Sequence, residues 1–279
     1  MTGGPAPFDE QRDTLAERLQ AVDGLLVLLD FDGTLAPIAD RPDAVALPDA
    51  TGDVLADLRD ARGVRVGVVS GRGLADLRDL VDVEGVAYAG NHGLELRVDG
   101  ETRYPVGSDF RATIERVVAD VDARLADVDG AFVEDKGVTA SVHYRLAADE
   151  DVPTVERAVR TAAEDVDDVR VTAGKAVLEL RPDVDWDKGR ATRWLYDRWV
   201  PDDEAWSAVY VGDDRTDEDA FRALPDAGFG VAVGRDAETA ADYHVPDTDA
   251  VREVLRWLAD RGVDRLAAAP DDPSTSRRP

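Results

Sequence analysis

The chain has 279 residues, of which 44% are hydrophobic, and its 60 acidic residues outnumber 33 Lys and Arg to give a net charge of −27 at pH 7. It contains no cysteine, which excludes disulfides, thiolate metal sites and cysteine nucleophiles. The acidity argues against nucleic acid as a partner, because phosphate backbones are bound by clustered Lys and Arg. The apolar run Leu25 to Leu29 is too short to cross a bilayer, and Met1 to Asp13 does not resemble a signal peptide. We therefore expect a cytoplasmic protein that binds no membrane.

The acidic excess also bears on the environment of the protein. Like charges repel one another in a compact chain, and molar salt shortens the screening length to about 3 Å. We therefore hypothesise a halophilic protein from a salty cytoplasm.

The first part of the chain alternates between helical and strand patterns. Leu15, Leu19 and Val22 recur at helical spacing, and Asp23-Gly24 ends that helix. The pattern then predicts a buried strand at 25–29, a helix at 50–62, a strand at 64–69, a helix at 74–80 and a strand at 86–89. Such an alternation indicates a doubly wound parallel sheet with helices on both faces.

The pattern changes in the middle of the chain. Asp99-Gly100 between residues 94–98 and 102–104 predicts a hairpin. Beyond it we expect helices at 110–125 and 153–165 and strands at 131–134, 139–144, 169–172 and 176–180. Two helices against an antiparallel sheet form a small α+β unit.

The first pattern returns near the end of the chain, with helices at 188–199 and 217–224 and strands at 208–211 and 228–233. We therefore predict an α/β fold in which an α+β unit is inserted into the doubly wound domain. Residues 1–106 and 182–266 form the two parts of that domain, 107–181 the insertion, and 267–279 a disordered Pro- and Ser-rich tail.

Two aspartates follow the first buried strand, in the segment Asp30-Phe31-Asp32-Gly33-Thr34. Ligands of open α/β sheets bind at the carboxyl ends of strands, and side chains two residues apart share one side of an extended segment. Two adjacent carboxylates require a divalent cation or a proton between them. The alternative is an Asx turn that simply ends the strand.

A hydroxyl and a lysine come next. Ser70-Gly71-Arg72 follows the second strand and could hold phosphate oxygens, although a Ser at a helix start is also an ordinary N-cap. Lys188 begins a helix, against the preference of the helix dipole, and could neutralise both carboxylates and a transferring phosphoryl group.

An acidic loop follows a later strand, in Gly212-Asp213-Asp214-Arg215-Thr216-Asp217. Three carboxylates on one loop suit Mg²⁺, which prefers oxygen ligands. The alternative is an acidic loop without a ligand, in a chain that is acidic throughout.

Taken together, these segments resemble the four motifs of the haloacid-dehalogenase-like (HAD-like) phosphatase superfamily, and the insertion is similar to its C2-type cap. The resemblance implies phosphoryl transfer through an aspartyl-phosphate, with Asp30 as nucleophile and Asp32 as general acid and then base. Thr34, Ser70 and Lys188 would hold the phosphoryl oxygens. Mg²⁺ would be held by Asp30, the Asp32 carbonyl and Asp213, with support from Asp214 and Asp217.

Further segments resemble the trehalose-6-phosphate phosphatases. They are Gly90-Asn91-His92-Gly93-Leu94-Glu95, Glu134-Asp135-Lys136-Gly137, His143-Tyr144-Arg145 and 174–182. Glu134 and Glu179 can accept hydrogen bonds from sugar hydroxyls, and Lys136 can donate to them. The resemblance adds Asn91, His92, Gly93 and Arg145 to the predicted substrate-binding residues. Arg72 is predicted as a further one, because an anionic substrate needs local positive charge in so acidic a protein. Glu134 and Lys136 could instead lie on a solvated strand face, His143 could belong to the core of the insertion, and Lys175 could only orient it.

The leading hypothesis is therefore a Mg²⁺-dependent phosphatase that acts on trehalose 6-phosphate, a small sugar phosphate, with a trehalose-6-phosphate synthase as pathway partner. Another sugar phosphatase, acting on sucrose phosphate or mannosyl-phosphoglycerate, is the alternative within enzymes. A phospho-acceptor receiver module is disfavoured, because it needs neither Asp32 nor an inserted cap. A non-catalytic sugar-phosphate sensor is disfavoured by the complete set of motifs.

Overall fold

The computed structural model describes residues 4–39, 44–104, 110–164, 166–174, 176–234, 238–263 and 266. It divides into two compact units: Met1–Val69, Arg78–Ala87 and Lys188–Pro279 form the first, and Ser70–Leu77 and Tyr88–Asp187 the second. Among the described residues, no helix combines the length and apolar character needed to cross a membrane. The expected tail, Lys175 and the expected boundary near residue 106 lie outside the described residues.

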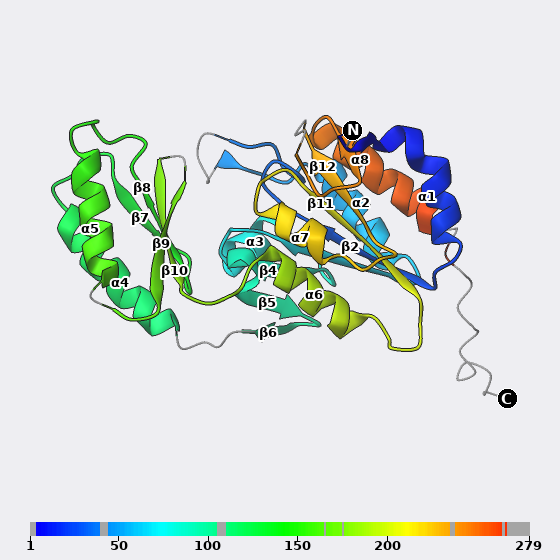
Figure 1. Ribbon diagram of the computed structural model, residues 1–279, viewed down its shortest axis with the longest axis horizontal. Helices are drawn as coiled ribbons and strands as arrows, with labels where there is room; N and C mark the ends of the chain where they lie inside the picture. Colours follow the sequence, from blue (N-terminus) through cyan, green and yellow to red (C-terminus); the bar gives the residue numbers. More distant parts are fainter. Residues whose placement is uncertain are drawn as a thin grey trace. The chain divides into compact units, whose positions relative to one another are not determined.

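A parallel sheet forms the centre of the first unit (Figure 1). Its strands occur in the order β1 (Ala6–Pro7), β13 (Tyr243–Val245), β12 (Phe229–Val233), β11 (Trp206–Gly212), β2 (Gly24–Leu29) and β3 (Val64–Val69). Every residue of β2 and β11 is buried, which explains their near-continuous apolar sequences. Asp30 and Asp213 follow these two adjacent strands, so their side chains start from the same edge of the sheet.

Two groups of helices accompany this sheet. The first comprises α1 (Arg12–Leu19), α2 (Asp49–Asp60), α8 (Thr248–Trp257) and the short helix at Leu258–Gly262, and the second comprises α6 (Lys188–Trp199) and α7 (Asp217–Ala223). Helix α8 is capped by Asp247, whose side chain accepts a hydrogen bond from the Ala250 amide. The predicted α/β class and doubly wound architecture are confirmed.

The second unit combines a hairpin region with an α+β layer. The first region contains β4 (Ala87–Gly90), β5 (Glu95–Val98) and β6 (Glu101–Arg103), which pair antiparallel, and α3 (Leu74–Val81) begins in the same unit. The layer contains α4 (Phe110–Leu125), α5 (Val152–Glu164) and a four-stranded sheet of order β7 (Phe132–Asp135), β8 (Ala140–His143), β10 (Val177–Pro182) and β9 (Val169–Gly174). The α+β character predicted for the insertion is confirmed.

The two faces of the four-stranded sheet differ in chemistry. Strand residues directly opposite one another share a face, and neighbours along a strand alternate between faces. One face carries Val142 and Leu178, which pack with Ile114 of α4 and Val155 of α5 into one apolar core. The opposite face carries Phe132, Glu134, Ser141, His143, Val177 and Glu179, as the register Glu134–Ser141–Glu179 and Phe132–His143–Val177 requires. We call this second surface the open face.

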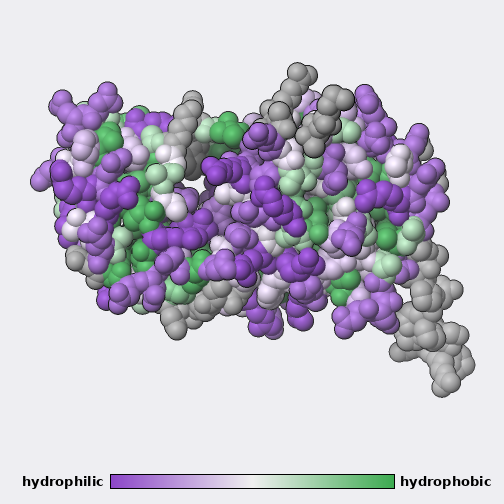
Figure 2. Space-filling model, in the orientation of Figure 1, coloured by the Kyte–Doolittle hydropathy of each residue, from purple (hydrophilic) through white to green (hydrophobic). Residues whose placement is uncertain are grey.

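The predicted elements agree with the structure to within two residues at each end, except the first helix, because α1 ends at Leu19 and Val22 lies outside it. Strands β1 and β13 were not predicted, because they are two and three residues long and give little periodic signal. Helix α8 was not predicted either, although Val251, Val254 and Leu255 recur there at helical spacing and are buried. Hydrophilic side chains predominate on the face shown in Figure 2, as the acidic composition implies.

Candidate active site

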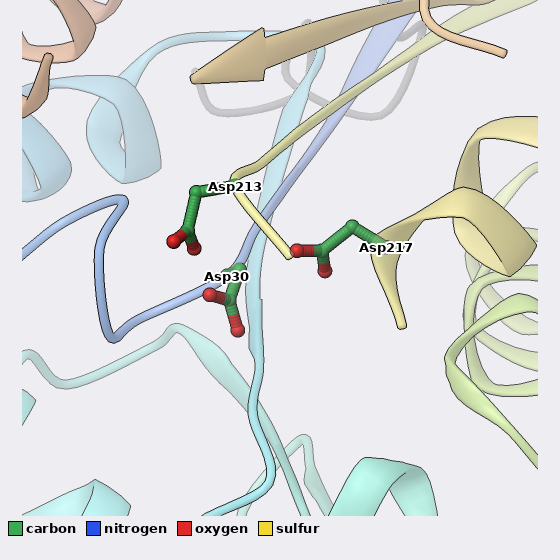
Figure 3. A group of neighbouring side chains, drawn as sticks. All are labelled: Asp30, Asp213 and Asp217. Carbon is green, nitrogen blue, oxygen red and sulfur yellow. The ribbon is translucent and has the colours of Figure 1, made fainter. Parts of the chain in front are cut away.

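Three carboxylates converge at one edge of the first unit's sheet (Figure 3). Asp30 follows β2, Asp213 follows β11, and Asp217 is the first residue of α7. Each offers one oxygen, and these oxygens all lie within 4.8 Å of one another. Residues separated by more than 180 positions are thus brought together because β2 and β11 are adjacent parallel strands.

Lys188 joins two of these carboxylates. Its Nζ donates to Asp30 Oδ1 at 2.6 Å and to Asp217 Oδ1 at 2.7 Å, and its side chain is only 3% exposed. The buried Tyr210 hydroxyl donates to the same Asp217 oxygen at 2.8 Å, and the Asp214 amide donates to Asp217 Oδ2 at 2.9 Å. Asp217 therefore orients Lys188 and the acidic loop.

Two glycines allow the carboxylates to approach so closely. Gly33 has φ +84°, and a Cβ at this position would collide with the Asp213 carboxylate. A Cβ on Gly212 would collide with the Asp217 side chain. The glycines in the two segments are thus required by packing at the site itself.

Burial and charge perturb the acidity of the site. Burial raises the pKa of Asp30 well above the usual aspartate range, although the Lys188 ammonium opposes this rise. Burial and the Asp217 carboxylate raise the pKa of Asp213 to about 6. Burial acts to lower the pKa of Lys188, but the Asp30 and Asp217 carboxylates outweigh it, so that this pKa is raised. The ammonium therefore stays charged at neutral pH.

The charge balance of the cluster fits a divalent cation. Among the described residues, the cluster has three carboxylates, and the Lys188 ammonium pairs with two of them, Asp30 and Asp217. Such an excess of buried negative charge is stabilised by a cation or by protons, and oxygen ligands suit Mg²⁺. The cluster supports an expectation of a divalent metal.

The other residues predicted for this site lie outside the group of three converging carboxylates. Thr34 is fully buried and its hydroxyl lies 3.4 Å from Asp213 Oδ1. Asp32 is half-buried, Asp214 is exposed, and neither belongs to the group of three converging carboxylates.

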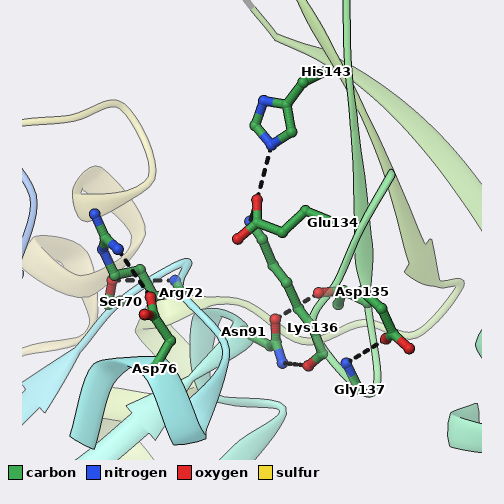
Figure 4. Close-up of polar contacts among 10 residues, drawn as sticks. Ser70, Arg72, Asp76, Asn91, Glu134, Asp135, Lys136, Gly137 and His143 are labelled. Atoms are coloured by element: carbon green, nitrogen blue, oxygen red, sulfur yellow. Dashed lines mark hydrogen bonds and ion pairs between the residues drawn. The ribbon is translucent and has the colours of Figure 1, made fainter. Parts of the chain in front are cut away.

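In the second unit, Ser70 and Arg72 form a turn that is tied to the segment after β4 (Figure 4). The Arg72 amide donates to Ser70 Oγ at 3.2 Å, and the Arg72 guanidinium pairs with Asp76 at 2.8 Å. The His92 amide donates to the Ser70 carbonyl at 2.8 Å. Ser70 and His92 are therefore held together by backbone bonds.

Asn91 is fully buried and connects three segments. Its Nδ2 donates to Glu95 Oε2 at 2.9 Å and to the Lys136 carbonyl at 2.8 Å, and its Oδ1 accepts from Thr139 Oγ1 at 2.5 Å. Its φ of 51° lies in the left-handed region, which asparagine tolerates better than most residues. The geometry of Asn91 supports a role in holding the Lys136 backbone.

The open face carries the remaining predicted residues. Glu134 Oε2 lies 2.8 Å from His143 Nε2 and 3.7 Å from Lys136 Nζ. Glu179 is in register with Glu134 across β8, two strand spacings away, which is roughly 9–10 Å. Arg145 follows β8 and is exposed.

Comparison with known proteins identifies the family of the chain. The family model described as Trehalose-phosphatase matches residues 28–249. The chain belongs to the trehalose-phosphatase family. A trehalose-phosphate phosphatase of Mycobacterium marinum is 40% identical over 267 residues, which cover 90% of this chain and 67% of that protein.

Solved structures from this family, and a more distant sugar phosphatase, have the same fold as this chain. The C-terminal domain of Candida albicans trehalose-6-phosphate phosphatase gives a TM-score of 0.72 at 26% identity, with 93% of this chain and 99% of that chain covered. A HAD subclass IIB sugar phosphatase gives a TM-score of 0.53 at 16% identity, with 86% of this chain and all of that chain covered, and supports the fold alone. The predicted HAD-like core with a cap is confirmed.

Several polar contacts of this trehalose-phosphatase family member could not be predicted from its sequence. Tyr210 lies within an unbroken buried strand, and nothing in the pattern distinguishes its hydroxyl. Thr139 and Glu95 both bond to Asn91, and the pairing of His143 with Glu134 depends on strand register. The segments that contain these residues were recognised, but their contacts were not.

Proposed function

We propose that this chain hydrolyses trehalose 6-phosphate to trehalose and inorganic phosphate in two steps through an aspartyl-phosphate on Asp30. The proposal rests mainly on the position of the buried Asp30 and the half-buried Asp213 at the carboxyl ends of β2 and β11, with the buried Lys188 ammonium bonded to Asp30. It provides a carboxylate nucleophile, a fixed ammonium and an acidic metal ligand in one place. Membership of the trehalose-phosphatase family supports the choice of substrate.

In the first step, an oxygen of Asp30 attacks the phosphorus and the bond from phosphorus to the sugar oxygen breaks. Asp32 donates a proton to that leaving oxygen, so that trehalose departs as a neutral alcohol. In the second step, Asp32 removes a proton from water, which attacks the phosphorus and releases phosphate from Asp30. Lys188 and the Thr34 and Ser70 hydroxyls stabilise the charge on the phosphoryl oxygens.

Mg²⁺ is the proposed cofactor, with Asp30, the Asp32 carbonyl and Asp213 as ligands and Asp214 and Asp217 in support. When bound, it neutralises negative charge on the phosphoryl group. The all-oxygen donor set and the excess negative charge of the cluster are consistent with this ion.

The second unit supplies the proposed sugar-binding residues. Glu134 and Glu179 lie on one face of the sheet and offer acceptors to sugar hydroxyls, while Lys136 offers donors. Arg72, His92, Gly93 and Arg145 remain proposed substrate contacts, and Asn91 would act by fixing Lys136.

Phosphate release from a panel of phosphosugars tests the proposal. With Mg²⁺ in molar KCl, we expect turnover of trehalose 6-phosphate well above that of sucrose 6-phosphate or mannosyl-phosphoglycerate. Asp30→Asn and Asp32→Asn should remove nearly all turnover, and Lys136→Ala should mainly raise KM. A preference for another phosphosugar would contradict the assigned substrate.

We also propose a salty cytoplasm as the place of action and a trehalose-6-phosphate synthase as the source of substrate. The proposal of high salt rests on the net charge of −27.

A further inference from the structure

His143 makes a contact that the proposed chemistry does not use. Its Nε2 lies 2.8 Å from Glu134 Oε2, and its ring stacks on Phe132 with the centroids 4.7 Å apart and an angle of 18° between the planes. Both partners belong to β7, and all three residues lie on the open face. The imidazole is therefore fixed by a carboxylate at one edge and by an aromatic ring on one side.

The contact leaves Glu134 in a defined orientation. His143 and Lys136 both lie on Oε2, and Figure 4 shows the other carboxylate oxygen turned away from the imidazole. Burial acts to raise the pKa of Glu134, but the hydrogen bond from His143 and the Lys136 charge outweigh it, so that this pKa is lowered. The lowered pKa keeps Glu134 ionised at neutral pH, so that both of its oxygens are free of protons and can accept hydrogen bonds from sugar hydroxyls.

We infer that His143 is a positioning residue for substrate binding, which holds the Glu134 carboxylate through Nε2 and is itself held by stacking on Phe132. The inference rests on the proposed function, since it assumes that Glu134 contacts the sugar. Because a carboxylate only accepts hydrogen bonds, Nε2 carries the proton in the neutral imidazole. Phe132 is 51% exposed, and its stacking on His143 accounts for an aromatic ring in that position.

The substitutions His143→Gln and His143→Asn both keep a polar side chain at this position, but only Gln can keep the hydrogen bond to Glu134. Gln places an amide N–H near the position of Nε2, whereas Asn reaches only to the position of Nδ1. We expect His143→Asn to raise KM for trehalose 6-phosphate about tenfold at nearly unchanged kcat, the effect of losing a hydrogen bond to a charged group. His143→Gln should stay within about threefold of the wild type by the same reasoning.

A double-mutant cycle tests whether His143 acts through Glu134. In a Glu134→Gln background, His143→Asn should cause little further rise in KM, because the carboxylate to be positioned is gone. His244→Asn is the matched control, since His244 bonds to the Pro5 carbonyl in the first unit and should leave KM unchanged. His143→Phe keeps a ring for stacking without the donor, so it should resemble His143→Asn even if the latter folds poorly.

A measurement on the protein without substrate tests the contact between His143 and Glu134 independently of the proposed activity. The chain has three histidines, so nitrogen NMR of the unliganded protein at alkaline pH can assign the tautomer of His143. We expect a proton on Nε2. A proton on Nδ1, equal damage by Gln and Asn, or additive effects in the cycle would each overturn the inference. If no phosphosugar is hydrolysed, the proposed function fails, while the tautomer still decides whether His143 holds Glu134.

Discussion

Replacing Lys188 by Met should destabilise the folded protein far more than an ordinary loss of one charge. The Lys188 ammonium is 3% exposed and bonds to Asp30 at 2.6 Å and to Asp217 at 2.7 Å. Met has a similar length but no charge, so the buried Asp30 and Asp217 carboxylates would remain beside the half-buried Asp213 without the ammonium that pairs with them. Removing one partner of a buried ion pair costs about 3–5 kcal/mol.

The expected loss can be measured by urea unfolding in metal-free buffer at pH 7 and fixed KCl concentration. By the usual relation for domains of this size, about 2–4 °C per kcal/mol, the same loss lowers Tm by roughly 6–20 °C. Adding Mg²⁺ should recover part of the stability of Lys188→Met, because a cation at the cluster replaces part of the lost positive charge.

Lys136→Met is the matched control for this experiment. The Lys136 side chain is 14% exposed and lies 3.7 Å from Glu134, so its loss should change stability by less than about 1 kcal/mol. If Lys188→Met unfolds within about 1 kcal/mol of the wild type, the account of the buried charge cluster is wrong.

Three further predictions concern other parts of the molecule. Gly33→Ala should lose both stability and activity, because φ +84° is unfavourable for alanine and its Cβ would collide with the Asp213 carboxylate; thermal melts and phosphate release check this. Burial raises the pKa of Glu95, so the folded state holds this proton more tightly than the unfolded state, and stability is lost as pH rises through the raised pKa. Glu95→Gln should therefore reduce the fall in the free energy of unfolding between pH 4 and pH 8. Urea unfolding across this range measures the change, and an unchanged pH dependence would contradict the prediction. The unfolding midpoint should rise steeply with KCl because the chain carries a net charge of −27, and full stability in dilute, metal-free buffer would refute that expectation.

The aspartates at the edge of the sheet could be predicted from sequence because each directly follows the strand that positions it. Asp30 and Asp213 each follow a continuous apolar run, and parallel strands bring their carboxyl ends to one edge. Lys188 could be predicted because it begins a helix against the dipole preference. These residues therefore needed only the order of elements and no knowledge of side-chain packing.

The contacts of the second unit could not be predicted in this way. The pairing of Glu134 with His143 depends on the register of β7 against β8, which the alternation of residues does not determine by itself. The network around Asn91 joins segments that are 45 and 48 residues apart, so its burial follows only from the tertiary fold. The motifs in the sequence therefore suggested candidate residues in this unit but not which of them touch one another.

Peptide masses measured during turnover show whether Asp30 carries a phosphoryl group. Wild-type protein is mixed with Mg²⁺ and trehalose 6-phosphate in molar KCl, quenched in acid within milliseconds, and digested for peptide mass spectrometry. We expect one phosphoryl group on Asp30 of the wild type and none on the Asp30→Asn variant. Continued phosphate release with no phosphorylated peptide, or with the label on another residue, would contradict it.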